Sequence, residues 1–209
     1  AILDYHHYNQ PVILKSDKIL DNENIKSCLD LLVKHHDALR MVYKNKGQWS
    51  QFNQSTDSNN YDIEYFDLRE SKNELNELRK QGKILQASIN LEKGPLIKVG
   101  HFSLSDGDRL VLVIHHLVVD AVSWRILLED LATLYKQKEN KEKLSLPLKT
   151  DSFQHWAYLQ KKYAQGNEIA LEKHYWQSLC KEKVTNLPIN KGVFKGTVRM
   201  DTSQSFLLD

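Results

Sequence analysis

The chain reads LVLVIHHLVVDAVSWRILLEDL over residues 110–131, and this stretch decides the fold. Residues 110–114 are apolar at every position, which is typical of a central strand buried on both faces. From about Ala121 to Gln137 the apolar residues recur at helical spacing, which predicts an amphipathic helix. Asp120 stands at the expected N-cap, where its carboxylate can accept backbone N–H groups. Two histidines and a carboxylate therefore lie where a buried strand gives way to a helix.

The rest of the chain mixes strand and helix patterns. Period-two patterns and turn signals predict strands at 10–14, 39–43, 49–52, 63–66, 96–102 and 109–114. Apolar residues three and four apart predict helices at about 22–36, 71–90, 121–137, 153–164 and 169–180. The tail from 187 onward is interpreted as a loop and then a strand. These elements predict a layered α/β fold, with residues 1–209 forming a single domain.

Composition is that of an ordinary globular protein. The 209 residues are 41% hydrophobic and 27% charged, with a net charge of +2. Basic residues are scattered among acidic ones, which argues against nucleic-acid binding, and no apolar stretch is long enough to span a membrane. The two cysteines, Cys28 and Cys180, favour buried or half-buried free thiols in a reducing, cytoplasmic setting over a disulfide framework. The first residues given lack the basic–apolar–small pattern of a signal peptide, and both ends are interpreted as cut from a longer protein.

Six of the nine histidines occur in tandem pairs. For His6-His7 and His35-His36 the sequence favours surface or structural rings. His115-His116 differs, because polar rings at the end of a buried strand must be satisfied or used. Three interpretations stay open for this pair: acid–base catalysis, a structural pair, and, least favoured, a metal site. The metal interpretation offers only Asp120 as a third ligand and has no H-E-x-x-H spacing.

The spacing from the histidines to Asp120 fits two kinds of acyltransferase. His116 and Asp120 form H-x-x-x-D, as in enzymes that activate a nucleophile against a thioester. His115 and Asp120 form H-x-x-x-x-D, as in glycerolipid acyltransferases, but the F-P-E-G-like segment that usually accompanies it is absent.

The longer string from His115 onward resembles the HHxxxDG motif of the condensation-domain superfamily of nonribosomal peptide synthetases. Within that superfamily, VSWRILLEDL at 122–131 is most similar to epimerization domains. The remaining segments that agree, in family order, are HHYNQPVIL at 6–14, KHHDALR at 34–40, LEKGPL at 91–96 and Tyr175-Trp176.

The resemblance implies a chloramphenicol-acetyltransferase-like fold, of which this chain is the N-terminal of two lobes. It implies that His116 is the catalytic acid–base group and that His115 supports it. It also implies a structural Asp120 that forms a salt bridge with Arg40. On weaker grounds it places four residues near the substrate channel: Ala121, Ser123, Trp124 and Arg125.

The activity implied is inversion of the Cα of an aminoacyl or peptidyl thioester carried on the phosphopantetheine arm of a carrier protein. No metal or bound cofactor is expected. The C-terminal lobe, which supplies a glutamate as the second acid–base group, is missing, so we expect the isolated chain to be inactive. Three alternatives are peptide-bond formation by a condensation domain, an inert docking lobe, and acyl transfer to a small molecule. Ala121 also departs from the motif's glycine, which predicts a tighter loop or a narrower channel.

Overall fold

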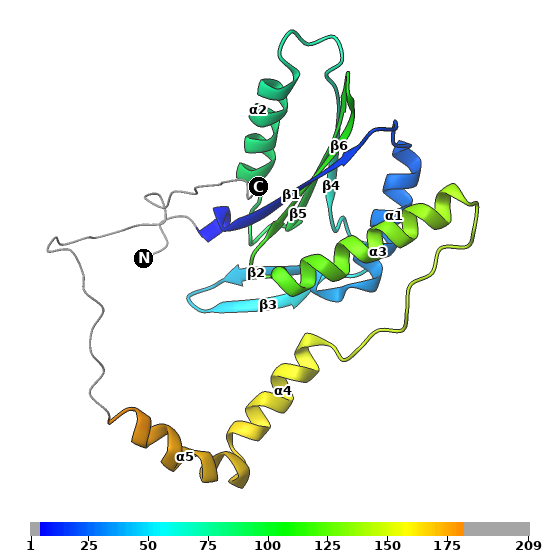
Figure 1. Ribbon diagram of the computed structural model, residues 1–209. Coiled ribbons are helices and arrows are strands. Elements are labelled where there is room, and N and C mark those ends of the chain that lie inside the picture. Colours follow the sequence, from blue (N-terminus) through cyan, green and yellow to red (C-terminus); the bar gives the residue numbers. More distant parts are fainter. Residues whose placement is uncertain (1–4, 182–209) are drawn as a thin grey trace, which may run out of the picture. The chain divides into compact units, whose positions relative to one another are not determined.

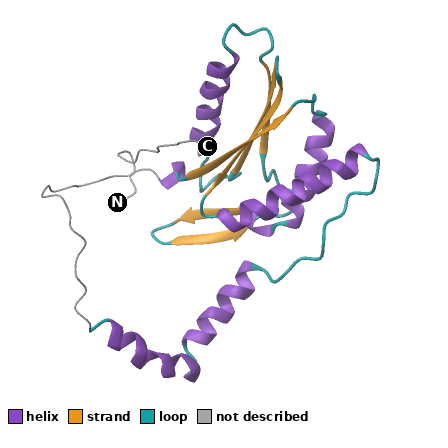
Figure 2. Ribbon diagram, in the orientation of Figure 1, coloured by secondary structure: helices purple, strands orange, loops and turns teal. Residues whose placement is uncertain are grey.

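The computed structural model describes residues 5–181 of the chain (Figures 1 and 2). Contacts divide the chain into two compact units, whose described parts are residues 5–149 and 150–181. The assignment of residues 1–209 to a single domain stays a prediction. None of the helices in the described residues is long and apolar enough to cross a membrane.

The larger unit is built on a four-stranded sheet. Its strands lie in the order β1 (Asn9–Ser16), β6 (Gly107–His115), β5 (Ile97–Leu104) and β4 (Asp62–Asp67). The β1–β6 and β6–β5 pairs are antiparallel, whereas β4 and β5 are parallel. A parallel pair needs a crossover, which helix α2 (Glu74–Ala87) supplies. β1 lies at the edge of the sheet, which explains why Pro11 is tolerated within it.

Strand β6 is covered by helices on both faces, as its apolar run predicts. Leu112 and Ile114 share a buried apolar layer with α1 (Asn22–His35) and α3 (Ala121–Glu139). On the other face, Leu85 of α2 lies against Gly100 of β5 so closely that a side chain there would collide with it. In Figure 1 the two groups of helices lie on opposite sides of the sheet. This double burial leaves the polar residues at the end of β6 surrounded by structure.

A two-stranded hairpin of β2 (Met41–Asn45) and β3 (Trp49–Asn53) completes the larger unit. The sequence predicted a strand from 39, but residues Asp37–Arg40 form a 3-10 turn. The predicted helix 71–90 is shorter, because the Asn73 side chain accepts a hydrogen bond from the Asn76 N–H and begins α2 at Glu74. A further 3-10 turn, Tyr5–His7, precedes β1.

The smaller unit contains α4 (Phe153–Ala164) and α5 (Asn167–Leu179), both close to the predicted ranges. The Tyr163 hydroxyl donates to a Glu172 carboxylate oxygen at 3.1 Å and links the two helices. The predicted strand after residue 187 lies outside the described residues. Both cysteines are free, as predicted; Cys28 is buried, whereas Cys180 is exposed rather than half-buried.

Candidate active site

The imidazole of His116 is held at both ring nitrogens. Its Nδ1 lies 3.0 Å from the Val119 carbonyl oxygen, which can only accept, so Nδ1 carries a proton. Its Nε2 lies 3.0 Å from the side-chain amide nitrogen of Gln10, on the neighbouring strand β1. An amide nitrogen only donates, so Nε2 of the neutral ring accepts this bond with its lone pair. The two contacts select one tautomer, with the proton on Nδ1 and the lone pair on Nε2.

Trp124 determines which way the Gln10 amide faces. The Trp124 indole N–H donates to Gln10 Oε1 at 2.9 Å, and an indole nitrogen cannot accept. Turning the amide over would set two donors against each other at Trp124 and would also require a proton on His116 Nε2. The order of donors is therefore fixed from Trp124 of α3, through Gln10 of β1, to His116 and the Val119 carbonyl.

Tyr8 covers one face of the His116 ring. The two rings are stacked, with centroids 5.0 Å apart and planes 14° apart. The His116 backbone N–H donates to the Tyr8 carbonyl at 2.9 Å, which extends the β1–β6 pairing by one step. Strand β1 thus supplies both the stacking ring and, through Gln10, the amide that meets Nε2.

His115 is buried, whereas His116 is half-exposed. Only 1% of His115 is exposed, and its Nε2 donates to the Tyr5 carbonyl at 2.8 Å. The Leu117 backbone N–H donates to His115 Nδ1 at 3.2 Å, so the ring is satisfied at both ends. Burial lowers the pKa of His115 from its usual range, and the neighbouring His6 and His116 act in the same direction. The arrangement supports the loop and leaves His115 no free nitrogen for a substrate.

Asp120 is the N-cap of α3. Its Oδ1 accepts the backbone N–H of Ser123 at 2.7 Å and the Ser123 hydroxyl at 2.6 Å. These hydrogen bonds hold the pKa of Asp120 below its usual range. Ala121 is the first residue of the helix, exposed, and outside the left-handed backbone region, so this loop does not need the glycine of the motif. That Ala121 and Ser123 line a substrate channel stays a prediction.

The expected salt bridge between Asp120 and Arg40 is wrong. Arg40 Nη1 instead donates to the carbonyls of Val33 and Lys34, at 2.6 and 2.9 Å, at the end of α1. Its Nε donates to the Gln54 carbonyl at 3.2 Å. The last carbonyls of a helix lack partners within it, and a guanidinium offers several donors to them. Asp120 is satisfied by its own helix, so neither residue needs the other.

The apolar face predicted for the helix from Ala121 includes Trp124, whose side chain is indeed buried, but the sequence did not point to Gln10, to Tyr8 or to the hydrogen bond between Trp124 and Gln10. The segment HHYNQPVIL resembles the family, but the resemblance assigns no role to Tyr8 or Gln10. A single glutamine on a mostly apolar edge strand was the available signal, and its meaning depends on pairing. Gln10 pairs with Ile114, two residues before His116, and only the β1–β6 register places it there.

Comparison with known proteins identifies the family to which the chain belongs. A family model described as "Condensation domain" matches residues 3–208. The chain belongs to the condensation-domain family. Among curated relatives, it is 43% identical over 175 residues to gramicidin S synthase 1 of Brevibacillus brevis, covering 83% of this chain and 16% of that protein. It is 41% identical over 177 residues to tyrocidine synthase 2 of Brevibacillus parabrevis, covering 84% of this chain and 5% of that protein.

Solved structures of the family share the fold. The epimerization domain from the third module of tyrocidine synthetase B is 38% identical, with a TM-score of 0.88 over 91% of this chain and 44% of that one. The starter condensation domain of rhizomide synthetase is 14% identical, with a TM-score of 0.71 over 84% of this chain and 43% of that one. The chloramphenicol-acetyltransferase-like α/β fold predicted from sequence is confirmed. The condensation-family chain therefore spans less than half of each of these structures.

Proposed function

We propose that this condensation-family chain is the N-terminal lobe of an epimerization domain in a nonribosomal peptide synthetase. The reaction would invert the Cα of an aminoacyl or peptidyl thioester delivered by a carrier protein. The tautomer of His116 carries this proposal, because a lone pair on Nε2 is what a general base needs. The identity of 38% to an epimerization domain, against 14% to a starter condensation domain, supports the same subtype.

Inversion requires a proton to leave one face of Cα and another to arrive at the opposite face. The thioester carbonyl acidifies the Cα–H, and His116 Nε2 would take this proton. The resulting imidazolium keeps its Nδ1–H bond to the Val119 carbonyl and gains a cation–π contact with Tyr8. The second proton would come from a glutamate of the C-terminal lobe, so the chain alone is expected to be inactive.

Gln10 acts in this proposal as a positioning residue. Its amide occupies the Nε2 lone pair in the structure, so the substrate Cα–H would replace it there. The displaced amide N–H is then a free donor beside the reacting atoms. An enolate oxygen needs such a donor as its charge develops.

The test uses this chain joined to its C-terminal lobe, with a carrier loaded with an L-aminoacyl or peptidyl thioester in D2O. We expect deuterium at Cα and formation of the D-residue, both abolished in His116→Ala. The matched control is His174→Ala, which removes an exposed ring of α5 outside the loop and leaves exchange unchanged. If a folded, carrier-binding domain exchanges nothing, the proposal fails. Peptide-bond formation with an acceptor thioester would then indicate a condensation domain, and its absence an inert docking lobe.

A further inference from the structure

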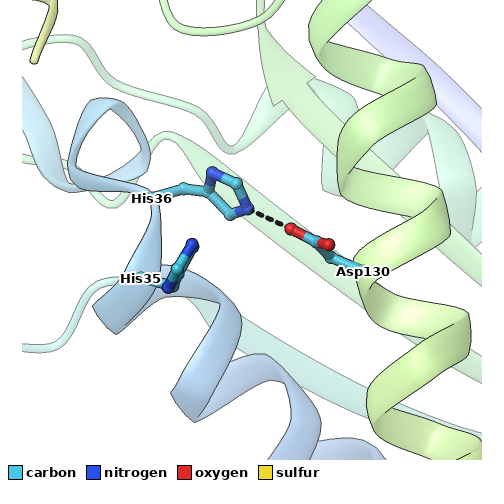
Figure 3. A group of neighbouring side chains, drawn as sticks. All are labelled: His35, His36 and Asp130. Atoms are coloured by element: carbon cyan, nitrogen blue, oxygen red, sulfur yellow. Dashed lines mark hydrogen bonds and ion pairs between the residues drawn. The ribbon is translucent and has the colours of Figure 1, made fainter. Parts of the chain in front are cut away.

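A second tandem pair, His35-His36, meets a carboxylate at the other end of the α1–α3 contact. His35 is the last residue of α1 and His36 is its C-cap, while Asp130 lies midway along α3. In Figure 3 the three side chains converge between the two helices, and a nitrogen of His35 faces the gap between the other two. One ligand atom from each lies within 4.8 Å of the others. Among residues 5–181 this is the group with the spacing of a metal site.

We propose that His35, His36 and Asp130 form a zinc site that clamps α1 to α3. Two imidazoles and one carboxylate are a usual ligand set for Zn²⁺, and water can complete the coordination. Imidazole nitrogens favour zinc over Mg²⁺ or Ca²⁺, which prefer oxygen ligands. The site lies at the C-terminal end of α1, where the helix dipole favours a cation.

The three ligand atoms lie within 4.8 Å of one another, near the spacing that zinc needs. Ligands at about 2.0–2.2 Å from a tetrahedral zinc lie about 3.4 Å apart. His36 Nε2 and Asp130 Oδ2 are 2.7 Å apart and would open slightly, with the metal replacing the proton between them. Their side chains are 23% and 16% exposed, so an ion can enter a site that is still largely shielded from water.

His35 is the residue that distinguishes a metal site from a simple hydrogen bond. Within the described part of the chain, neither of its ring nitrogens has a hydrogen-bond partner, and its ring contacts that of His36 edge-on. Burial and the neighbouring His36 lower the pKa of His35, and the neutral form of an imidazole is the one that binds a metal. The nearby Lys149 ammonium is paired with Asp37 at 3.1 Å, which offsets its repulsion of a cation.

The test titrates Zn²⁺ alone into the full chain, prepared without a histidine tag. Calorimetry should give one site with a Kd in the micromolar range or tighter, a raised Tm and no response to Mg²⁺. Co²⁺ in place of Zn²⁺ should give the absorption of a low-coordinate site.

His35→Ala is the decisive variant, because it breaks no hydrogen bond and should leave the metal-free Tm nearly unchanged. We expect it to weaken Zn²⁺ binding at least tenfold, and Asp130→Asn to do the same. His174→Ala, which removes a histidine from α5, is the matched control and should bind as the unaltered chain does. The proposal is overturned if the unaltered chain shows no site, or if His35→Ala binds as tightly as His174→Ala. Neither result depends on epimerization, so the two proposals can fail separately.

Discussion

The same dipeptide, His-His, ends a strand at His115-His116 and a helix at His35-His36, and the two pairs are held differently. After β6, both rings are fixed by the backbone and by β1, and each nitrogen has an identified partner. After α1, His36 is tied to Asp130 of α3, whereas His35 has a vacant lone pair. The strand alternates its side chains, so it sends one ring into the core and leaves the other half-exposed. The helix end keeps both rings at one corner.

This difference separates a site that fixes a tautomer from a site that offers ligands. His116 is useful as a base only if the proton stays on Nδ1, which requires partners at both nitrogens. His35 is useful as a ligand because it lacks them. Histidine chemistry is thus set by the element that carries the pair and by its neighbours, and each of the following substitutions acts on that distinction.

His116→Ala should have the largest effect on activity and a small one on stability. Loss of a general base typically costs about 10²–10⁴-fold in rate. The ring is half-exposed, so we expect the free energy of unfolding to fall by only about 1 kcal/mol. Deuterium exchange at Cα in the completed domain and urea unfolding of the same protein measure the two effects. A folded variant that keeps its exchange rate would remove His116 from the mechanism.

His115→Ala should do the reverse and mainly unfold the loop. The substitution leaves a cavity and removes the hydrogen-bond partner of the Tyr5 carbonyl and of the Leu117 N–H. We expect a loss of about 3 kcal/mol in the free energy of unfolding, measured in urea. His7→Ala, which removes an exposed ring nearby, should stay within about 0.5 kcal/mol. Equal losses from the two variants would show that His115 does not support the site.

Trp124→Phe tests whether a remote donor fixes the tautomer of His116. Without the indole N–H, the Gln10 amide is free to turn its oxygen to His116, which favours a proton on Nε2 and opposes the preference for Nδ1–H that the Val119 carbonyl imposes. We expect ¹⁵N chemical shifts of His116 to report a mixture of tautomers, together with a fall of about tenfold in exchange rate, comparable to the loss of one positioned hydrogen bond. Trp124→Leu also removes the indole N–H, with different packing, and should give the same tautomer change. An unchanged tautomer in both variants would contradict the relay through Gln10.

Stability should fall as the pH is lowered through the histidine range, chiefly because of His115. The pKa of the buried ring is depressed, so below about pH 6.5 the unfolded chain takes up a proton that the folded chain does not. The slope from this residue is at most about 1.4 kcal/mol per pH unit, and it vanishes above that range. Urea unfolding between about pH 7.5 and 5.5 should show a slope that His115→Asn reduces more than His35→Asn does. If His35→Asn reduced the slope more than His115→Asn does, the more exposed ring of His35 would be the main cause of the pH dependence of stability.

The sequence was sufficient for most of the fold and for part of the site. The apolar run at 110–114 predicted a buried central strand, and Asp120 predicted the helix start, because both depend on local pattern. The Gln10 contact and the Asp130 contact could not be predicted in this way. Each joins segments about a hundred residues apart, and only strand register or helix packing brings them together. The prediction for Arg40 was wrong for a different reason, because its partners are the nearby carbonyls of Val33 and Lys34 at the end of α1, which the motif does not reveal.

A double-mutant cycle on Asp120 and Arg40 measures the coupling energy between their side chains, which is the smallest effect predicted here. It tests directly whether the two residues form a salt bridge. Asp120→Ala removes an N-cap and should cost about 1 kcal/mol in the free energy of unfolding. Arg40→Met removes donors from the carbonyls that end α1 and should cost a similar amount. Because the two side chains serve different helices, the costs should add to within about 0.5 kcal/mol. A coupling energy of several times that size, measured by urea unfolding at low salt, would show that Asp120 and Arg40 do form a salt bridge. Additivity would instead mean that Asp120 caps the start of α3 and Arg40 the end of α1 independently of each other.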